Sequence, residues 1–442
     1  MKLKSITVGG FRNLKRTTVN FDGITALVAL NSFGKSNYLR AIEFGINFYK
    51  GSSAMRKRSF SDESAMPLNK ITCNDDFYFE LEIENSSNAD HQNIIYGYTF
   101  RWKRVDKTGA KITSEWLKVK PVEKKKFTQI INRSETKALY RNSESGRCSK
   151  KSQVAEDEML LQRMASLDDC FYTDIIKAVL SVSIFVDHRL DRSDEYEIQP
   201  LIPENDDGLS LNSSIGVPHT MAILKEKCPD EYAKITDAFC QLYPNISKIE
   251  VKSYPFDPIS SELPSLPKDI PYTFAKAAYI LWVIDDTLNQ PIPFEALSDG
   301  AKRILWMFTC IAKAKLNQLA LIAIEEPENS VHPKLLQSYL DIINQLLDGC
   351  SMIMTSHSPY IVGYLPLKSL MIGLPNDDGT ACFYPIKGSQ NNRVINDARE
   401  SDMTTGTYIF DLLSGSESDY EQLRQYLDCG GRSSENRGGE SL

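Results

Sequence analysis

The feature that most constrains the fold of this chain is an eight-residue segment, Ala29-Leu30-Asn31-Ser32-Phe33-Gly34-Lys35-Ser36. An apolar run at 24–28 precedes it and a helix-like stretch at 38–48 follows it, which is the order of strand, loop and helix in a phosphate-binding loop. Gly34 allows a positive φ, so that consecutive backbone N–H groups can point at phosphate oxygens. Lys35 would then reach the β- and γ-phosphates, and the Ser36 hydroxyl would help to hold Mg²⁺.

Ala29 stands where the usual G-x-x-x-x-G-K-[ST] pattern has its first glycine. A methyl group is tolerated at this position if φ is negative, whereas a positive φ would strain the loop. A Gly-Lys-Ser triplet can also occur by chance in a surface turn. The assignment of a nucleotide site therefore depends on motifs farther along the chain, and Ala29 is one reason to expect slow hydrolysis.

The composition is that of a globular chain. With 442 residues, 42% of them hydrophobic, the chain can form two or three domains, or one domain with large insertions. No apolar run approaches the roughly 20 residues that span a bilayer, and the N-terminus has no signal-peptide core, so a cytoplasmic location is the default expectation. The nine cysteines are scattered and form no C-x-x-C pair, which argues against a zinc site and against a disulfide framework.

The net charge of −7 conceals a basic segment at 101–153. It contains 16 Lys and Arg against 5 Asp and Glu, a balance of +11 that leaves −18 for the rest of the chain. Such a segment can bind nucleic acid or an acidic partner. It can equally be a solvated insertion, and the sequence does not decide between the two.

Hydrophobic periodicity divides the chain into an α/β head and a large insertion. Period-two alternation at 77–84 and 96–102 predicts an antiparallel sheet, and three-to-four spacing predicts helices within 154–183 and over 217–242. We predict four parts: the first half of the head at 1–50, an insertion at 51–270 with a β-rich region at about 75–150 and a helical region at about 154–245, the second half of the head at 271–370, and an extension at 371–442 with a disordered end.

A second motif, Leu297-Ser298-Asp299-Gly300, comes just before the apolar stretch 304–312, which is a predicted helix. Ser298 and Gly300 at a helix N-terminus offer a hydroxyl, backbone N–H groups and the positive end of the helix dipole to an anion. In isolation, Ser298 and Asp299 would be read only as N-cap residues.

A third motif lies at the end of the apolar stretch 319–324, a predicted buried strand that runs into Glu325-Glu326-Pro327. Glu325 would bind Mg²⁺ directly or through water, and Glu326 would polarise the attacking water as general base. The alternative is an acidic turn that ends the strand and has no chemical role.

A further strand at 351–355 leads to His357, which could sense the γ-phosphate or orient the lytic water. His357 lies 31 residues after Glu326, with a predicted helix at 334–347 between the two strands. This βαβ arrangement places both strand tips on one edge of a parallel sheet. We assign no chemistry to the other histidines, among them His188, His219 and His332.

Five pieces occur together in order, at 10–13 (Gly-Phe-Arg-Asn), 31–37, 297–300, 324–329 with His332-Pro333, and 355–359. Together they resemble the motifs of ABC-type ATPases of the SMC, RecF and OLD group, whose ATPase domains are described as AAA-15 or AAA-21. The resemblance covers two segments, 1–48 and 272–370. It implies an α/β P-loop head with a mixed or parallel sheet flanked by helices, interrupted by a β-rich and then helical insertion.

The resemblance also implies a composite ATP site with ATP and Mg²⁺ as cofactors. Two heads would enclose two ATP molecules, with Ser298, Asp299 and Gly300 of one subunit closing on the γ-phosphate held by the other, so that a monomer is a poor enzyme. Glu326 and His357 would be catalytic, and Ser36 and Glu325 would hold Mg²⁺. The nucleotide-binding positions carried over are Arg12, Asn31, Ser32, Phe33, Gly34, Lys35, Ser36 and Asn37. Glu325 departs from the usual Asp, and no Q-loop glutamine can be placed.

The wider role follows from what the chain lacks. It has no long coiled-coil arms, and about 85 residues after His357 leave no room for a TOPRIM nuclease. It is similar to stand-alone ATPases of anti-phage systems such as Septu, PARIS and retron-associated modules. The resemblance implies an ATP-hydrolysing, oligomeric sensor or regulator that acts with a separate effector such as a nuclease. The alternatives are a RecF-like repair ATPase that binds DNA through 101–153, and a nuclease with unrecognised carboxylates in the insertion.

Overall fold

The computed structural model describes residues 1–60, 69–85, 92–104, 108–121, 126–144, 146–167, 170–189, 191–256, 266–267, 269–376 and 378–429. The chain divides into two compact units, Met1–Val186 with Ser351–Leu442, and Asp187–Cys350. These divisions fall at other positions than the predicted boundaries at 50, 270 and 370. Parts of the basic segment (105–107, 122–125 and 145) and the end predicted to be disordered (430–442) lie outside the described residues.

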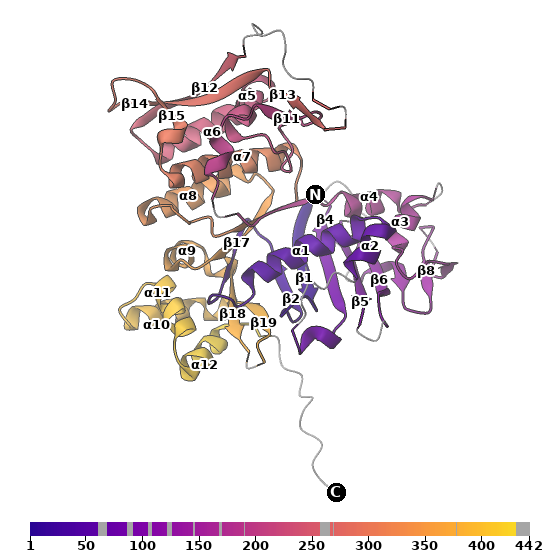
Figure 1. The fold of residues 1–442 in the computed structure, drawn as a ribbon. Coiled ribbons are helices and arrows are strands. Elements are labelled where there is room, and N and C mark those ends of the chain that lie inside the picture. The colour runs from indigo at the N-terminus through magenta and orange to yellow at the C-terminus, as the bar shows by residue number, and fades with distance from the viewer. Residues whose placement is uncertain are drawn as a thin grey trace. The chain divides into compact units, whose positions relative to one another are not determined.

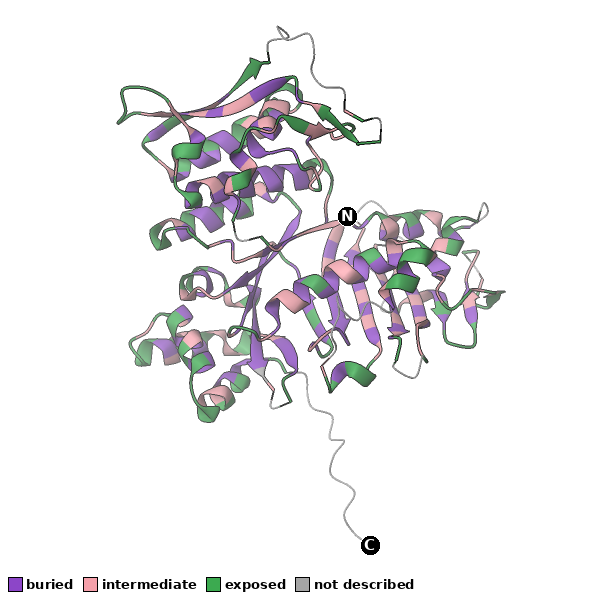
Figure 2. Cartoon of the chain, viewed as in Figure 1, coloured by how far each residue is buried: buried purple, intermediate pink, exposed green. Residues whose placement is uncertain are grey.

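The first unit contains an antiparallel sheet of eight strands in the order β2-β1-β4-β5-β6-β7-β8-β9 (Figure 1). The strands are β1 (Lys2–Gly9), β2 (Thr17–Asn20), β4 (Phe77–Glu84), β5 (Asn93–Arg101), β6 (Lys111–Lys120), β7 (Thr128–Arg133), β8 (Ala138–Tyr140) and β9 (Lys150–Ser152). Buried and partly exposed residues alternate along β4, as the period-two pattern predicted (Figure 2). Because β1 pairs with β4, the N-terminal strands and the predicted β-rich region form one sheet.

Helix α1 (Lys35–Lys50) packs on the buried face of this sheet. The Tyr38 hydroxyl donates to the carbonyl of Ile6 on β1 at 3.0 Å, and the Tyr98 hydroxyl of β5 donates to the carbonyl of Gly45 at 2.7 Å. A Cβ on Gly45 would lie 2.1 Å from the Phe79 ring, so the helix approaches the sheet more closely than any other residue there would allow. The start of α1 is therefore held rigidly against β1.

The first unit has a second sheet, formed by β17 (Ser351–Ser356), β3 (Ile24–Val28), β18 (Leu370–Pro375) and β19 (Ala381–Pro385). Strands β17 and β18 run parallel to β3, and β19 runs antiparallel to β18. All residues of β3 are buried, as expected for a strand covered on both faces. The chain beyond 370 thus supplies a direct neighbour of the strand that carries the phosphate-binding loop.

The remaining elements of the first unit are mainly helical. They are α2 (Ser53–Ser59), α3 (Leu160–Ala165), α4 (Thr173–Ser181), α9 (Pro359–Tyr364), α10 (Asn391–Glu400), α11 (Thr405–Ser414) and α12 (Glu417–Tyr426), with short 3-10 turns η1 (Thr72–Asn74), η5 (Leu367–Ser369) and η6 (Gly388–Gln390). Strand β10 (Ile184–Asp187) ends at the boundary between the two units.

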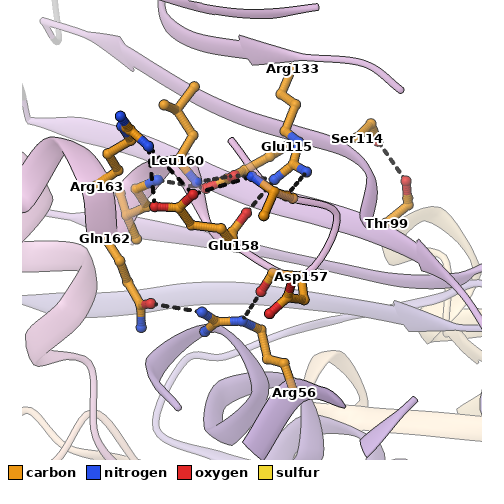
Figure 3. A network of polar contacts seen from close by, with 12 residues as sticks. Arg56, Thr99, Ser114, Glu115, Arg133, Asp157, Glu158, Leu160, Gln162 and Arg163 are labelled. Atoms are coloured by element: carbon orange, nitrogen blue, oxygen red, sulfur yellow. Dashed lines mark hydrogen bonds and ion pairs between the residues drawn. The ribbon is translucent and has the colours of Figure 1, made fainter. Parts of the chain in front are cut away.

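A buried polar network fastens α2 and α3 to the large sheet (Figure 3). Glu115 on β6 is completely buried, and its carboxylate accepts hydrogen bonds from the backbone N–H groups of Leu160 at 2.7 Å and Leu161 at 2.8 Å. Arg56 of α2 donates to the Gln162 side chain at 3.0 Å. Because the first N–H groups of a helix have no partner within the helix, the carboxylate satisfies them and is itself satisfied.

The second unit consists of helices and short antiparallel sheets. The helices are α5 (Val217–Lys227), α6 (Pro229–Leu242), α7 (Asp299–Leu316) and α8 (Pro333–Leu346), with η3 (Ser193–Tyr196) and η4 (Phe294–Ala296); the strands are β11 (Leu201–Pro203), β12 (Ile246–Pro255), β13 (Tyr272–Phe274), β14 (Ala277–Asp285), β15 (Ile292–Pro293) and β16 (Leu321–Glu325). The prediction of one helix over 217–242 is wrong. It is two helices, because Pro229 has no N–H to continue α5 and Cys228 before it leaves the helical region, with φ −138° and ψ 61°.

Within the part of the chain that the structure describes, no helix is both long enough and apolar enough to cross a membrane.

Candidate functional site

The loop between β3 and α1 has the backbone geometry of a phosphate-binding loop. Gly34 has φ 131°, and a Cβ at this position would lie 2.9 Å from the Cβ of Ala381, so both the conformation and the space require glycine. Asn31 and Ser32 are exposed in the loop, and Ser32 also has a positive φ of 59°. The positive φ predicted at Gly34 is therefore present.

Ala29 is accommodated without backbone strain. Ala29 is not one of the described non-glycine residues that have a positive φ. Its methyl group instead faces Gly373 on β18, where an added Cβ would lie 2.8 Å from the Ala29 Cβ and 2.5 Å from the Phe33 ring. The glycine missing from the loop is thus matched by a glycine on the neighbouring strand.

Lys35 lies within the loop and is only 6% exposed. Its ammonium donates to the carbonyl of Ala29 at 2.8 Å and to that of Leu30 at 3.0 Å, and it lies 3.4 Å from Nδ1 of His357. Because an ammonium can only donate, Nδ1 is the acceptor if this contact is a hydrogen bond. A buried cation at the first turn of a 16-residue helix fits the phosphate group of a nucleotide.

The position of His357 follows from the register of the parallel strands. Ser356, the last residue of β17, lies opposite Val28, the last residue of β3. The residues that follow both strands therefore meet at one edge of the sheet. The structure brings Lys35 and His357 together within the first unit.

Three polar side chains connect the turn after β1 to the loop. Arg12 donates to Oδ1 of Asn37 at 3.0 Å, Asn37 donates to Oδ1 of Asn13 at 2.8 Å, and Asn13 donates to the carbonyl of Phe33 at 3.0 Å. Burial, and then repulsion by Arg40, lower the pKa of Arg12. Asn13 was not among the predicted site residues, although its neighbour Arg12 was. Its amide holds the loop at the residue before Gly34.

In the second unit, Glu325 is the last residue of β16, as predicted. Its carboxylate Oε1 lies 2.6 Å from Nδ1 of His188. The sequence analysis assigned no chemistry to His188, and it did not foresee that His188 contacts the predicted Mg²⁺ ligand. No pattern in the sequence indicated the contact, because 137 residues separate the two positions.

Glu326 has a positive φ of 45°, which is unfavourable for any residue other than glycine by about 1–2 kcal/mol. Arg303 of α7 stabilises this turn: its Nη2 donates to the carbonyl of Glu325 at 2.8 Å and to that of Glu326 at 3.0 Å. Arg303 is 3% exposed, and burial lowers its pKa. Sequence reasoning did not select Arg303, although it lies five residues after Ser298.

The segment at 298–300 begins α7. The Ser298 hydroxyl accepts a hydrogen bond from the N–H of Ala301 at 3.3 Å, which is the N-cap role named above as the alternative. Ser298 and Asp299 are both exposed. A Cβ on Gly300 would lie 2.2 Å from the carbonyl oxygen of Ser330, so only glycine fits between α7 and the turn after Glu326.

His332 has a structural function. Its Nδ1 accepts a hydrogen bond from the N–H of Lys334 at 3.2 Å and thereby caps helix α8.

Among the described residues, no group of three or more His, Cys, Asp or Glu side chains could hold a metal ion. Mg²⁺ in phosphate sites usually takes one or two carboxylates, substrate phosphates and water. Ser36 and Glu325, the predicted Mg²⁺ ligands, belong to different compact units, so their joint role stays a prediction.

The model of the AAA ATPase domain family (AAA_15) matches residues 1–362. Two solved structures resemble the fold. One is a crystal structure of the SmcHead bound to the C-winged helix domain of ScpA, with a TM-score of 0.52 and 13% identity over 89% of this chain and 100% of that chain. The other is an Smc head domain with an extended coiled coil bound to the C-terminal domain of ScpA derived from Pyrococcus furiosus, with a TM-score of 0.50 and 12% identity over 90% and 99%.

At these identities the likeness establishes the fold alone, which is that of an SMC ATPase head. The prediction of an α/β head of the ABC type, with mixed sheets flanked by helices, is confirmed. The family match extends through the loop at 29–36, Glu325, Glu326 and His357. This chain belongs to the AAA ATPase domain family.

Proposed function

We propose that this chain binds ATP and hydrolyses it to ADP and phosphate, and that it does so after self-association. The observation that carries the proposal is the buried Lys35 ammonium, held by the loop carbonyls and lying 3.4 Å from Nδ1 of His357. Membership of an ATPase family supports the reaction itself.

Each residue has a defined task in this proposal. Lys35 and the loop N–H groups neutralise the β- and γ-phosphates, and Glu326 accepts a proton from the attacking water. His357 contacts the γ-phosphate or orients that water. Bound Mg²⁺, held by Ser36 and Glu325, would neutralise the charge that develops on the phosphates.

The signature at 298–300 is proposed to act on the nucleotide of a second subunit. Two observations support this: Ser298 and Asp299 are exposed, and they stand at the N-terminus of α7, an 18-residue helix. An exposed helix N-terminus with a free face can receive the γ-phosphate of a partner-bound ATP. At low protein concentration, the rate of hydrolysis should therefore increase with more than the first power of the protein concentration.

Three variants test the ATPase proposal. Lys35→Ala should abolish ATP binding, Glu326→Gln should bind ATP, fail to hydrolyse it and stabilise the associated state, and Ser298→Arg should bind ATP without hydrolysing it. Lys248→Ala and Glu400→Gln change exposed residues and serve as matched controls. Normal hydrolysis by the Glu326 variant would contradict the role of the base, and normal hydrolysis by a monomeric Ser298 variant would contradict the composite site.

The wider role that we propose is that of a sensor or regulator that acts with a separate effector, such as a nuclease, in prokaryotic antiviral defence. It rests on the similarity to stand-alone ATPases of anti-phage systems. The two SMC heads described above are each bound to a domain of ScpA, so heads of this fold can carry a protein partner. The test is protection of cells against phage by this chain with its neighbouring genes. Protection should be lost in Lys35→Ala.

A RecF-like, DNA-binding ATPase is the second candidate. The edge strand β9 favours it, because Lys150 and Lys151 are exposed there, as are Lys137 and Arg147 nearby. DNA binding should then weaken steeply between about 50 mM and about 200 mM salt, and DNA should stimulate hydrolysis. Changing Lys150 and Lys151 to Ala should reduce the salt dependence. If DNA binding is the same with and without these changes, this surface is not the DNA-binding site.

A further inference from the structure

The contact between His188 and Glu325 needs an explanation that the ATPase proposal does not supply. Nδ1 of His188 lies 2.6 Å from Oε1 of Glu325, and their side chains are 27% and 17% exposed. A carboxylate oxygen accepts, so Nδ1–H is the donor and the hydrogen bond is charge-assisted. Such a bond at a sheltered position restricts the rotation of both side chains.

The backbone that carries His188 is itself fixed to α7. Asp187 and Arg192 form a buried ion pair, and the Arg192 guanidinium lies over the Trp306 ring at 4.1 Å from its centroid. Farther along, the Tyr196 hydroxyl donates to the carbonyl of Lys302 at 2.6 Å. Asp187, Arg192 and Tyr196 therefore cannot move away from α7 without breaking buried contacts, and these contacts hold the backbone beside His188 in place.

Position 325 carries glutamate, where the resemblance given in the sequence analysis implies aspartate. Glutamate has one more rotatable bond than aspartate, so its carboxylate has more orientations to lose when it binds an ion. The carbonyl of Glu325 is already held by Arg303 at 2.8 Å, which fixes the backbone but not the carboxylate. A hydrogen bond from His188 to Oε1 restricts the orientation of that carboxylate.

We infer that His188 is a positioning residue, whose Nδ1–H fixes the orientation in which the Glu325 carboxylate would bind Mg²⁺. The inference rests on the proposed function, since it assumes that Glu325 is a Mg²⁺ ligand. His188 takes no part in proton transfer in this assignment. Its effect is on how well Mg²⁺ is held when ATP is bound, and not on ATP binding itself.

The test compares His188→Ala, which removes the donor, with His188→Asn, whose side-chain amide can donate from nearly the same place. In His188→Ala the Mg²⁺ concentration for half-maximal hydrolysis should rise about ten-fold, while the KM for ATP and the ATP affinity in EDTA stay unchanged. His188→Asn should return the Mg²⁺ requirement to within about three-fold of the native value. His219→Ala, which changes a histidine stacked on Tyr279 in the same unit, is the matched control.

A second readout does not require hydrolysis. With a non-hydrolysable ATP analogue, Mg²⁺ should raise the Tm of the native chain and of His188→Asn, and should raise that of His188→Ala only at about ten-fold higher Mg²⁺. An unchanged Mg²⁺ requirement in His188→Ala, or an Asn variant that is folded but no better than Ala, would overturn the inference. A native chain that neither hydrolyses ATP nor binds it through Lys35 would instead overturn the proposed function.

Discussion

The guanidinium of Arg303 donates to the carbonyl of Glu326 at 3.0 Å, at a residue whose φ is 45°. The first helix turns after Ser298 thus hold the backbone of the proposed general base in an unfavourable conformation. Without the guanidinium, Glu326 would relax towards a negative φ and its carboxylate would move. The signature helix and the base are mechanically connected within one unit.

Replacement of Arg303 by Met should therefore reduce kcat by about 10²-fold while ATP still binds, because displacing a catalytic group by about 1 Å has this effect. Arg303→Lys should fall between Met and the native chain, since an ammonium keeps the charge but lacks the planar fork. Steady-state hydrolysis and the Kd for a fluorescent ATP analogue measure the two effects. Lys248→Met, an exposed change on β12, is the control, and equal kcat values for all four proteins would refute the connection.

The pair Ala29 and Gly373 gives a second prediction. Gly373→Ala should destabilise the chain by about 1–3 kcal/mol and weaken ATP binding, because the new methyl group would meet the Phe33 ring and the Ala29 methyl. Adding Ala29→Gly to Gly373→Ala should recover part of the lost stability, since it removes only the contact at 2.8 Å. Chemical denaturation of the native chain, both single variants and the double variant measures these differences. Gly388→Ala, where nothing lies within 4 Å of the added Cβ, is the control.

Gly300→Ala should lower both stability and hydrolysis, although Gly300 lies at the start of a helix whose first residues are exposed. The added Cβ would lie 2.2 Å from the carbonyl oxygen of Ser330, so α7 or the turn after Glu326 must shift. We expect a lower Tm and a loss of hydrolysis. In Gly363→Ala, on α9, nothing lies within 4 Å of the Cβ, and the change should raise stability by about 0.4–1 kcal/mol. Similar behaviour of the two alanine variants would show that the close approach at Gly300 is absent in solution.

The parts of the site that could be predicted from the sequence are those with local requirements. Gly34 needs a positive φ before a helix, and Ser298 caps a helix three residues before the N–H that it accepts from. The strands at 77–84 and 351–356 follow from a period-two pattern and from a short apolar run. Such features depend only on neighbours within a few residues, and a sequence displays them directly.

The parts that could not be predicted depend on distant contacts. His188 reaches Glu325 across 137 residues, and Gly373 faces Ala29 because β18 happens to pair with β3. Neither contact leaves a periodic trace in the chain. The error over 217–242 has another cause, since the apolar spacing continues through Pro229 although the hydrogen bonding cannot.

The last prediction concerns the turn after β1, which carries Arg12 and Asn13. Lys15, two residues farther on, donates to Asp378 at 2.7 Å and so ties this turn to the connection between β18 and β19. The hydrogen bonds from Lys15 and then from Thr380 lower the pKa of Asp378 from 3.8 to about 2. A carboxyl whose pKa is lowered by folding contributes stability above its ordinary pKa, and this contribution is lost as the pH falls through the folded value.

The native chain should accordingly be more stable than Asp378→Asn above about pH 5, with a constant difference, and the difference should shrink as the pH falls from 3.8 towards about 2. The difference between the urea midpoints of the two proteins at each pH measures this effect, because the titration of all other groups is common to both. Asp411→Asn, an exposed change on α11, is the control. A difference that grows on acidification would contradict the direction of the shift. If the tie also supports the loop, Asp378→Asn should weaken ATP binding at neutral pH through Asn13, whose amide holds the carbonyl of Phe33.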